Sequence, residues 1–198
     1  MIATGGLSGG ISVHVSGGSF WAGVRQGVIS SGLNHAMHMG ASKPPKRTLI
    51  FNGKELIIFE NGEIIARYPA VSGRMLENGS FDYSAERQKV HDVGPIPEGE
   101  YSVNMNNTQK WSKLSLLQKT YALIRRGEFP GGTTAWGSER VDINPSNVNP
   151  FDIRLRSGFT IHGGSFPGSA GCIDLTIFDA KFFNTIRNSG VIRLTVKY

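Results

Sequence analysis

Apolar residues recur in short runs separated by turn residues from about position 47 onward. The stretch "RTLIFNGKELIIFENGEIIARYPAVSG" (47–73) holds three runs rich in β-forming residues, with Asn52-Gly53 and Asn61-Gly62 between them. Asn-Gly between such runs is a strong hairpin signal, because both residues tolerate a positive φ at low cost. The pattern predicts three strands in a meander.

Later segments extend the β pattern. "VGPIPEGEYSVNM" predicts a proline-bordered turn into a strand, and "VIRLTVKY" predicts a final strand at the C-terminus. "FDIRLRSGFTIHGG" alternates with period two, as a strand with two different faces does. One face would carry Phe151, Ile153 and Leu155, and the other Asp152, Arg154 and Arg156.

Helices are few in this pattern. "TIFDAKFFNTIRNSG" has helical periodicity, with Asp174 or Thr176 as the N-cap and Gly190 as the stop. "WSKLSLLQKTYALIRRG" fits either a helix or a helix followed by a strand. The predicted fold class is therefore mainly β with few helices.

The first 45 residues have a different composition, rich in glycine and serine. Within them Phe20, Trp21, Val24 and Val28 recur at helical spacing, which predicts a short amphipathic helix. "SKPPKR" then breaks any helix. We therefore expect a glycine-rich, partly helical linker over 1–45 and one folded domain over 46–198.

Composition and charge narrow the class of protein. The 198 residues are 39% apolar, which is ordinary for a globular protein, and the net charge of +6 favours an anionic partner such as nucleic acid, lipid headgroups or a cell-wall polymer. No apolar run is long enough to span a bilayer, and the N-terminus lacks the pattern of a signal peptide. A single cysteine excludes an internal disulfide.

That cysteine lies in "FTIHGGSFPGSAGCIDLT", where Cys172 follows His162 by ten residues. A thiol becomes a nucleophile when an imidazolium or backbone amides stabilise its thiolate. The glycine-rich loop could bring the two side chains together, with the amides of Gly171 and Cys172 cupping an oxyanion and Ser169 fixing the turn or bonding to the site. The alternative is a buried cysteine in a turn beside an unrelated histidine.

The segment "IHGGSFPGSAGCIDL" resembles the active-site segment of L,D-transpeptidase catalytic domains, the YkuD-like fold. The first part of the family pattern matches His162-Gly163, and the second matches Ser169, Gly171 and Cys172. "YPAVSG" and "GPIPEGEY" are similar to the family's early strands, so the resemblance covers about 47–198. The short loop and Ser-x-Gly-Cys are most similar to interbacterial L,D-transpeptidase effectors of type VI secretion.

Two positions depart from the family pattern. Ala170 stands where most members have a second histidine, and Asp174 stands where arginine or asparagine is usual. These departures affect substrate positioning more than the nucleophile.

The resemblance implies a β-sandwich that acts on peptidoglycan stem peptides without a cofactor, between the third residue and the terminal D-alanine. It implies Cys172 as the nucleophile, His162 as the base and the Gly163 carbonyl as the group that orients the imidazole. The expected substrate-binding residues are Ser169, Arg154, Arg156 and Asp174; arginines on a strand face can also simply be solvated.

The leader "GGSFWAGVRQGVISSGLNHAMH" resembles the stretch that joins an Rhs-type delivery scaffold to its C-terminal toxin. We therefore expect a delivered antibacterial toxin that acts in the periplasm of a target bacterium. Its partners would be a secretion apparatus or scaffold and a cognate immunity protein, and not nucleic acid. His35 and His38 lie in this stretch without a cysteine or carboxylate cluster, so we expect no metal site.

Other functions fit the residues less well. A sortase-like transpeptidase also has histidine before cysteine, but its Thr-Leu-x-Thr strand is missing, and papain-like amidases have the reverse order. A non-catalytic wall-binding module and a wall-building, cross-linking transpeptidase remain alternatives.

Overall fold

The computed structural model describes residues 46–149 and 156–198. The predicted extension over 1–45, with its amphipathic helix and both of its candidate metal-binding histidines, His35 and His38, lies outside the described residues. So do Arg154 and the alternation predicted over 150–155.

The predicted meander is confirmed. Strands β1 (Arg47–Phe51), β2 (Glu55–Glu60) and β3 (Glu63–Pro69) pair antiparallel in sequence order. Gly53 has a φ of 82°, and Asn61 and Gly62 have φ values of 53° and 92°. The two Asn-Gly pairs thus supply the left-handed backbone that tight hairpin turns require.

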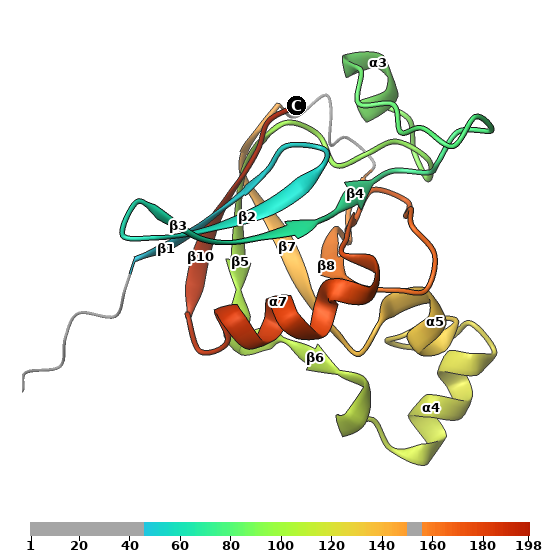
Figure 1. The fold of residues 1–198 in the computed structure, drawn as a ribbon. Coiled ribbons are helices and arrows are strands. Elements are labelled where there is room, and N and C mark those ends of the chain that lie inside the picture. Colours follow the sequence, from blue (N-terminus) through green and yellow to red (C-terminus); the bar gives the residue numbers. More distant parts are fainter. Residues whose placement is uncertain (1–45, 150–155) are drawn as a thin grey trace, which may run out of the picture. The chain divides into compact units, whose positions relative to one another are not determined.

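The remaining strands complete the sheet, and the buried apolar side chains form one core (Figure 1). Strand β10 (Val191–Val196) lies parallel to β1 and is followed across the sheet by β5 (Gly99–Asn104) and β7 (Glu139–Val148). The order continues through β8 (Thr160–His162) and β9 (Ile173–Asp174) to β4 (Val71–Ser72), and β6 (Gln109–Lys110) pairs with β7. This sandwich-like sheet confirms the predicted mainly β class.

Strand β7 was not predicted, although it joins the two halves of the sheet. It contains Pro145, which cannot donate to a ladder and so argues against a central strand. The structure accommodates this proline opposite Tyr101, next to a register shift between Glu100 and Tyr101. An irregularity of this kind depends on the partner strand and is invisible in the local sequence.

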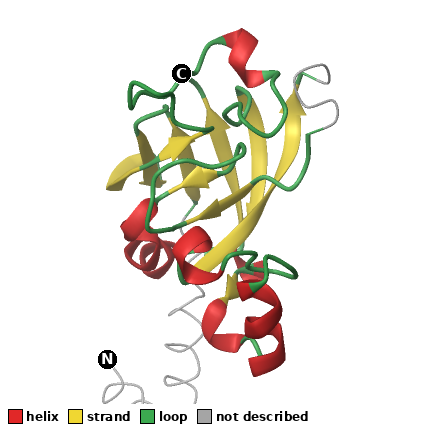
Figure 2. Cartoon of the chain, turned by 90° about the vertical axis from the view of Figure 1, so that its right-hand side faces the viewer, coloured by secondary structure: helices red, strands yellow, loops and turns green. Residues whose placement is uncertain are grey.

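Four short α-helices and three 3-10 turns complete the described residues (Figure 2). The helices are α3 (Ala85–Gln88), α4 (Leu116–Leu123), α5 (Gly132–Trp136) and α7 (Asp179–Ile186). The 3-10 turns are η1 (Met105–Asn107), η2 (Trp111–Lys113) and η3 (Thr176–Phe178). None of the described helices is long and apolar enough to cross a bilayer.

The predicted C-terminal helix is present, but its predicted ends were wrong. It begins at Asp179 after the separate turn η3, because Thr176 has a positive φ of 49° that no α-helix accepts. It ends at Ile186, before Gly190, because Arg187 is extended and Asn188 takes the left-handed conformation.

Helix α7 packs on the sheet through one apolar face. Phe182, Phe183 and Ile186 are buried, and the ring of Tyr68 on β3 meets Phe182 edge-on with centroids 5.8 Å apart. The Tyr68 hydroxyl and the Thr185 hydroxyl share a 2.7 Å hydrogen bond. The helix thereby holds the segment that follows β9, next to the predicted catalytic residues.

Candidate active site

Strands β8 and β9 bring the predicted histidine and cysteine together. His162 is the last residue of β8, and Cys172 directly precedes β9. The two strands pair parallel, with Ile161 opposite Ile173. The intervening loop therefore leaves the sheet and returns to it beside its starting point. Both side chains are nearly inaccessible, with 3% of His162 and 8% of Cys172 exposed.

The imidazole of His162 has a defined orientation. Its Nδ1–H donates to the carbonyl oxygen of Gly163 at 2.6 Å, because a carbonyl can only accept. The other ring nitrogen, Nε2, is left for the thiol of Cys172. Burial works to lower the pKa of His162, but the hydrogen bond to Cys172 and the charge of the thiolate raise it above its ordinary value.

The pKa of the Cys172 thiol is shifted in the opposite direction. Burial works to raise its pKa, yet the hydrogen bond and positive charge of His162 outweigh burial, so that the pKa lies below its ordinary value. Opposite shifts in two contacting groups favour a thiolate beside an imidazolium. This is the activated state of a cysteine nucleophile.

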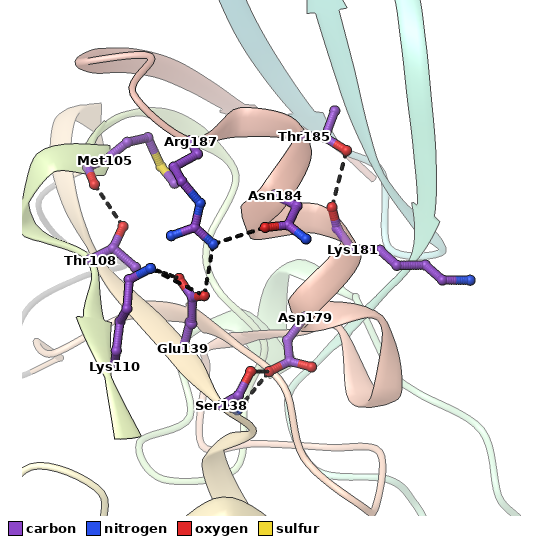
Figure 3. Close-up of polar contacts among 10 residues, drawn as sticks. All are labelled: Met105, Thr108, Lys110, Ser138, Glu139, Asp179, Lys181, Asn184, Thr185 and Arg187. Carbon is purple, nitrogen blue, oxygen red and sulfur yellow. Dashed lines mark hydrogen bonds and ion pairs between the residues drawn. The ribbon is translucent and has the colours of Figure 1, made fainter. Parts of the chain in front are cut away.

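Gly163 must be a glycine for a steric reason. A Cβ there would lie 2.5 Å from the Thr176 carbonyl oxygen and 2.6 Å from the Cβ of Asp179. The buried Asp179 carboxylate accepts hydrogen bonds from the amide and hydroxyl of Ser138, at 2.6 and 2.8 Å (Figure 3). The hydrogen bonds connect Asp179, the first residue of α7, to Ser138, which directly precedes β7. Asp179 also packs against Gly163, whose carbonyl orients His162.

A second polar cluster links the start of β7 to β6 and to the residue that follows α7 (Figure 3). Glu139, at the start of β7, pairs with Lys110 of β6 at 3.3 Å and with Arg187 after α7 at 3.0 Å. Arg187 also donates to Asn184. The beginning of β7, which lies beside β8, is thus fixed from both sides.

The loop that carries Cys172 is held by Ser169 and Asp174. The Ser169 hydroxyl donates to the Cys172 carbonyl at 2.7 Å, and its amide donates to Gly73 at 2.9 Å. The carboxylate of Asp174 accepts from the amide of Gly168 at 3.0 Å and from that of Thr176 at 2.8 Å. Asp174 is buried, and burial raises its pKa. Asp174, which was predicted to bind substrate, thus holds the loop through its carboxylate.

Arg156, which was also predicted to bind substrate, is held by the backbone in this structure. Its guanidinium is buried and donates to the carbonyls of Gly94 and Pro95, each at 2.8 Å, and to that of Gln88. Gly171 has a φ of +112°, and a Cβ there would collide with the same guanidinium. The Arg156 guanidinium therefore packs closely against Gly171, the residue directly before Cys172.

Two further residues at the site were missed by sequence reasoning. The ring of Trp136, the last residue of α5, lies 4.7 Å from the imidazole of His162, centroid to centroid. The guanidinium of Arg140 lies 4.5 Å from the Trp136 ring, and Arg140 is paired with His162 in the register of β7 and β8. No local motif marks these residues, because the pairing of β7 with β8 brings Arg140 to the histidine and the placement of helix α5 brings Trp136 to it.

The comparisons with known proteins agree with the fold. The family model of the L,D-transpeptidase catalytic domain (YkuD) matches residues 46–188. The matched range includes every described strand up to β9, helix α7 and both His162 and Cys172. The chain belongs to the family of L,D-transpeptidase catalytic domains.

Similar solved structures share low identity with this chain. L,D-transpeptidase 3 from Mycobacterium tuberculosis, solved with a faropenem-derived adduct, is 16% identical, with a TM-score of 0.42 and coverage of 78% of this chain and 61% of that one. The L,D-transpeptidase from Xylanimonas cellulosilytica is 16% identical, with a TM-score of 0.39 and coverage of 82% and 68%. The cell-shape-determining protein Pgp2 from Campylobacter jejuni is 14% identical, with a TM-score of 0.41 and coverage of 82% and 54%. None of the curated proteins compared with the chain matches it.

Proposed function

We propose that this chain is a cysteine L,D-transpeptidase and L,D-carboxypeptidase that acts on the tetrapeptide stems of peptidoglycan. The observation that carries the proposal is the buried His162–Cys172 pair, in which the Gly163 carbonyl holds the imidazole and the thiol pKa is lowered. The family supplies the substrate class.

In the proposed reaction, the Cys172 sulfur attacks the carbonyl carbon of the third stem residue. The amides of Gly171 and Cys172 hold the oxyanion that forms. The carbon–nitrogen bond then breaks, and the protonated His162 gives its proton to the amine of the departing D-alanine. Water, a free D-amino acid or the amine of a second stem resolves the thioester, while His162 removes the proton from the attacking group.

The proposal extends to an antibacterial toxin that is delivered to the periplasm of a target cell by a secretion apparatus or Rhs-type scaffold. Its producer would encode an immunity protein that covers Cys172. A cross-linking enzyme must seat a bulky acceptor stem, whereas only nine residues lie between His162 and Cys172, with Phe166 75% exposed. We therefore expect hydrolysis and D-amino-acid exchange to outpace cross-linking, so that donor tetrapeptides are depleted.

The direct test incubates the purified full chain with tetrapeptide muropeptides and measures release of D-alanine by mass spectrometry. Wild type should release it, and Cys172→Ala should not. Retention of D-alanine by wild type, with the muropeptide bound, would instead identify a non-catalytic wall-binding module.

The test of the toxin role directs the full chain to the periplasm of a susceptible bacterium. Accumulated tripeptides or exchanged tetrapeptides, fewer cross-links and lysis are the expected results. More cross-links between two third-position residues, in healthy cells, would identify a wall-building transpeptidase and refute the toxin role.

A further inference from the structure

An open cavity of about 510 Å³ lies beside the loop that carries the nucleophile. Its floor includes Ser169, whose hydroxyl donates to the carbonyl of Cys172. Its walls come from segments distant in sequence, namely the chain after β4, the chain after α4, helix α5 and the β8–β9 loop. The residues that line it are Arg74, Met75, Arg125, Ala135, Pro167, Gly168, Ser169 and Ala170.

The lining of the cavity carries positive charge and contains no acidic side chain to balance it. Its lining contains Arg74 and Arg125 but no aspartate or glutamate. Both arginines are exposed, and within residues 46–149 and 156–198 neither side chain has a hydrogen-bond or ion-pair partner. Arg156 and Arg140, by contrast, are held by carbonyls or by Gln109. Two free guanidinium groups at one cavity suit a carboxylate, which they can bind by charge-assisted hydrogen bonds.

The backbone at Arg125 is unusual for an arginine. The residue directly follows Ile124, the C-cap of α4, and has a left-handed φ of 59°. Glycine is the residue that this position favours, because a side chain makes the left-handed conformation unfavourable. The left-handed backbone thus favours a glycine over an arginine here, and the Arg125 side chain lines the cavity and is exposed.

The geometry points to Arg74 and Arg125 as the residues that bind the carboxylate of the amino acid beyond the scissile bond; this rests on the proposed function. In acylation that carboxylate belongs to the departing D-alanine. In exchange it belongs to the incoming D-amino acid, whose amine attacks the thioester and passes a proton to His162. Recognition of a free carboxylate explains how the site selects the end of a stem.

The test compares two substrates, a stem tetrapeptide with a free D-alanine carboxylate and the same tetrapeptide with a C-terminal amide. Wild type should prefer the free acid. Arg74→Gln and Arg125→Gln should each lower kcat/KM for the acid by about ten- to a hundred-fold and leave that for the amide nearly unchanged. Arg125→Gly should lose the same preference with no fall in Tm, because glycine suits the backbone.

Arg126→Gln is the matched control, since Arg126 is the exposed neighbour of Arg125, does not line the cavity and carries the same charge. It should keep the wild-type preference. The rate at which neutral iodoacetamide alkylates Cys172 should be the same in all four variants, which shows that the nucleophile is intact.

The outcomes separate this inference from the proposed function. If wild type releases D-alanine and the variants of Arg74 and Arg125 keep its preference for the acid, the inference is wrong and the function stands. If wild type releases no D-alanine, the function fails, and calorimetry in the Cys172→Ala background decides the inference. In that experiment, weaker binding of the free acid but not of the amide, after replacement of either arginine, supports the inference. An affinity for the acid equal to that of the Cys172→Ala parent overturns the inference.

Discussion

Replacement of His162 by alanine tests whether the imidazole activates the nucleophile. In wild type, His162 lowers the pKa of Cys172 against the opposing effect of burial. Without the imidazole, burial loses its main opponent, and the pKa of Cys172 should rise. A free cysteine, whose pKa is about 8.5, is only about 3% thiolate at pH 7. Alkylation of His162→Ala at pH 7 should therefore be slower than that of wild type, and a fully ionised thiol would exceed a free cysteine by about thirty-fold.

The sign of the pH dependence follows from the two shifts. Because the pKa of Cys172 is lowered, its thiolate persists as the pH falls, until the pH passes below that lowered value. Because the pKa of His162 is raised, its imidazolium persists as the pH rises, until the pH passes above that raised value. Wild type should therefore react with iodoacetamide well below the pH at which free cysteine reacts, and His162→Ala only under alkaline conditions.

The assay measures alkylation rates by mass spectrometry from about pH 5 to about pH 10. His162→Gln keeps a hydrogen-bonding group without the charge, and it should behave like His162→Ala if the charge is the decisive factor. His91→Ala removes an exposed histidine and should have the wild-type profile. An unchanged profile in His162→Ala would refute the coupling of the two side chains and with it the assignment of His162 as the base.

Three further variants test the framework of the site. Gly163→Ala should abolish turnover and lower the unfolding free energy by about 1–3 kcal/mol, because its Cβ meets Thr176 and Asp179; a melting curve like that of wild type would contradict this. Phe182→Ala should lower the unfolding free energy in urea by about 3–5 kcal/mol, since the ring is fully buried. Asp174→Asn should lower kcat more than it raises KM in tetrapeptide kinetics, because Asp174 holds the loop; a rise in KM alone would restore a substrate-binding role.

Removal of the N-terminal extension tests the predicted domain boundary. A chain that begins at Arg47 should fold and release D-alanine at the wild-type rate, because strand β1 begins at that residue. Insolubility or loss of release would show that residues before Arg47 contribute to the domain.

Local chemistry allowed much of the fold to be predicted. The two Asn-Gly hairpins, the strand after Pro97 and the final strand each depend on turn residues or alternation within about ten residues. Strand β7 could not be found in this way, because its proline is acceptable only beside the register shift against β5. The ends of α7 depend on single left-handed residues, Thr176 and Asn188; asparagine takes this conformation readily, but no residue preference predicts it for a threonine.

The sequence by itself determined the pair of residues at the centre of the site. A single cysteine in a glycine-rich segment, ten residues after a histidine, was enough to predict that Cys172 and His162 lie together, since few residue types can act as nucleophile and base. Only the tertiary structure decided what surrounds them. It buried Arg156 against backbone carbonyls and placed Trp136 against the histidine and Arg140 against Trp136. It also left two arginines, which have no partner among the described residues, at a cavity beside the loop. Whether an arginine is structural or available to a ligand depends on burial and on partners far away in the sequence, and these exist only once the strands have paired.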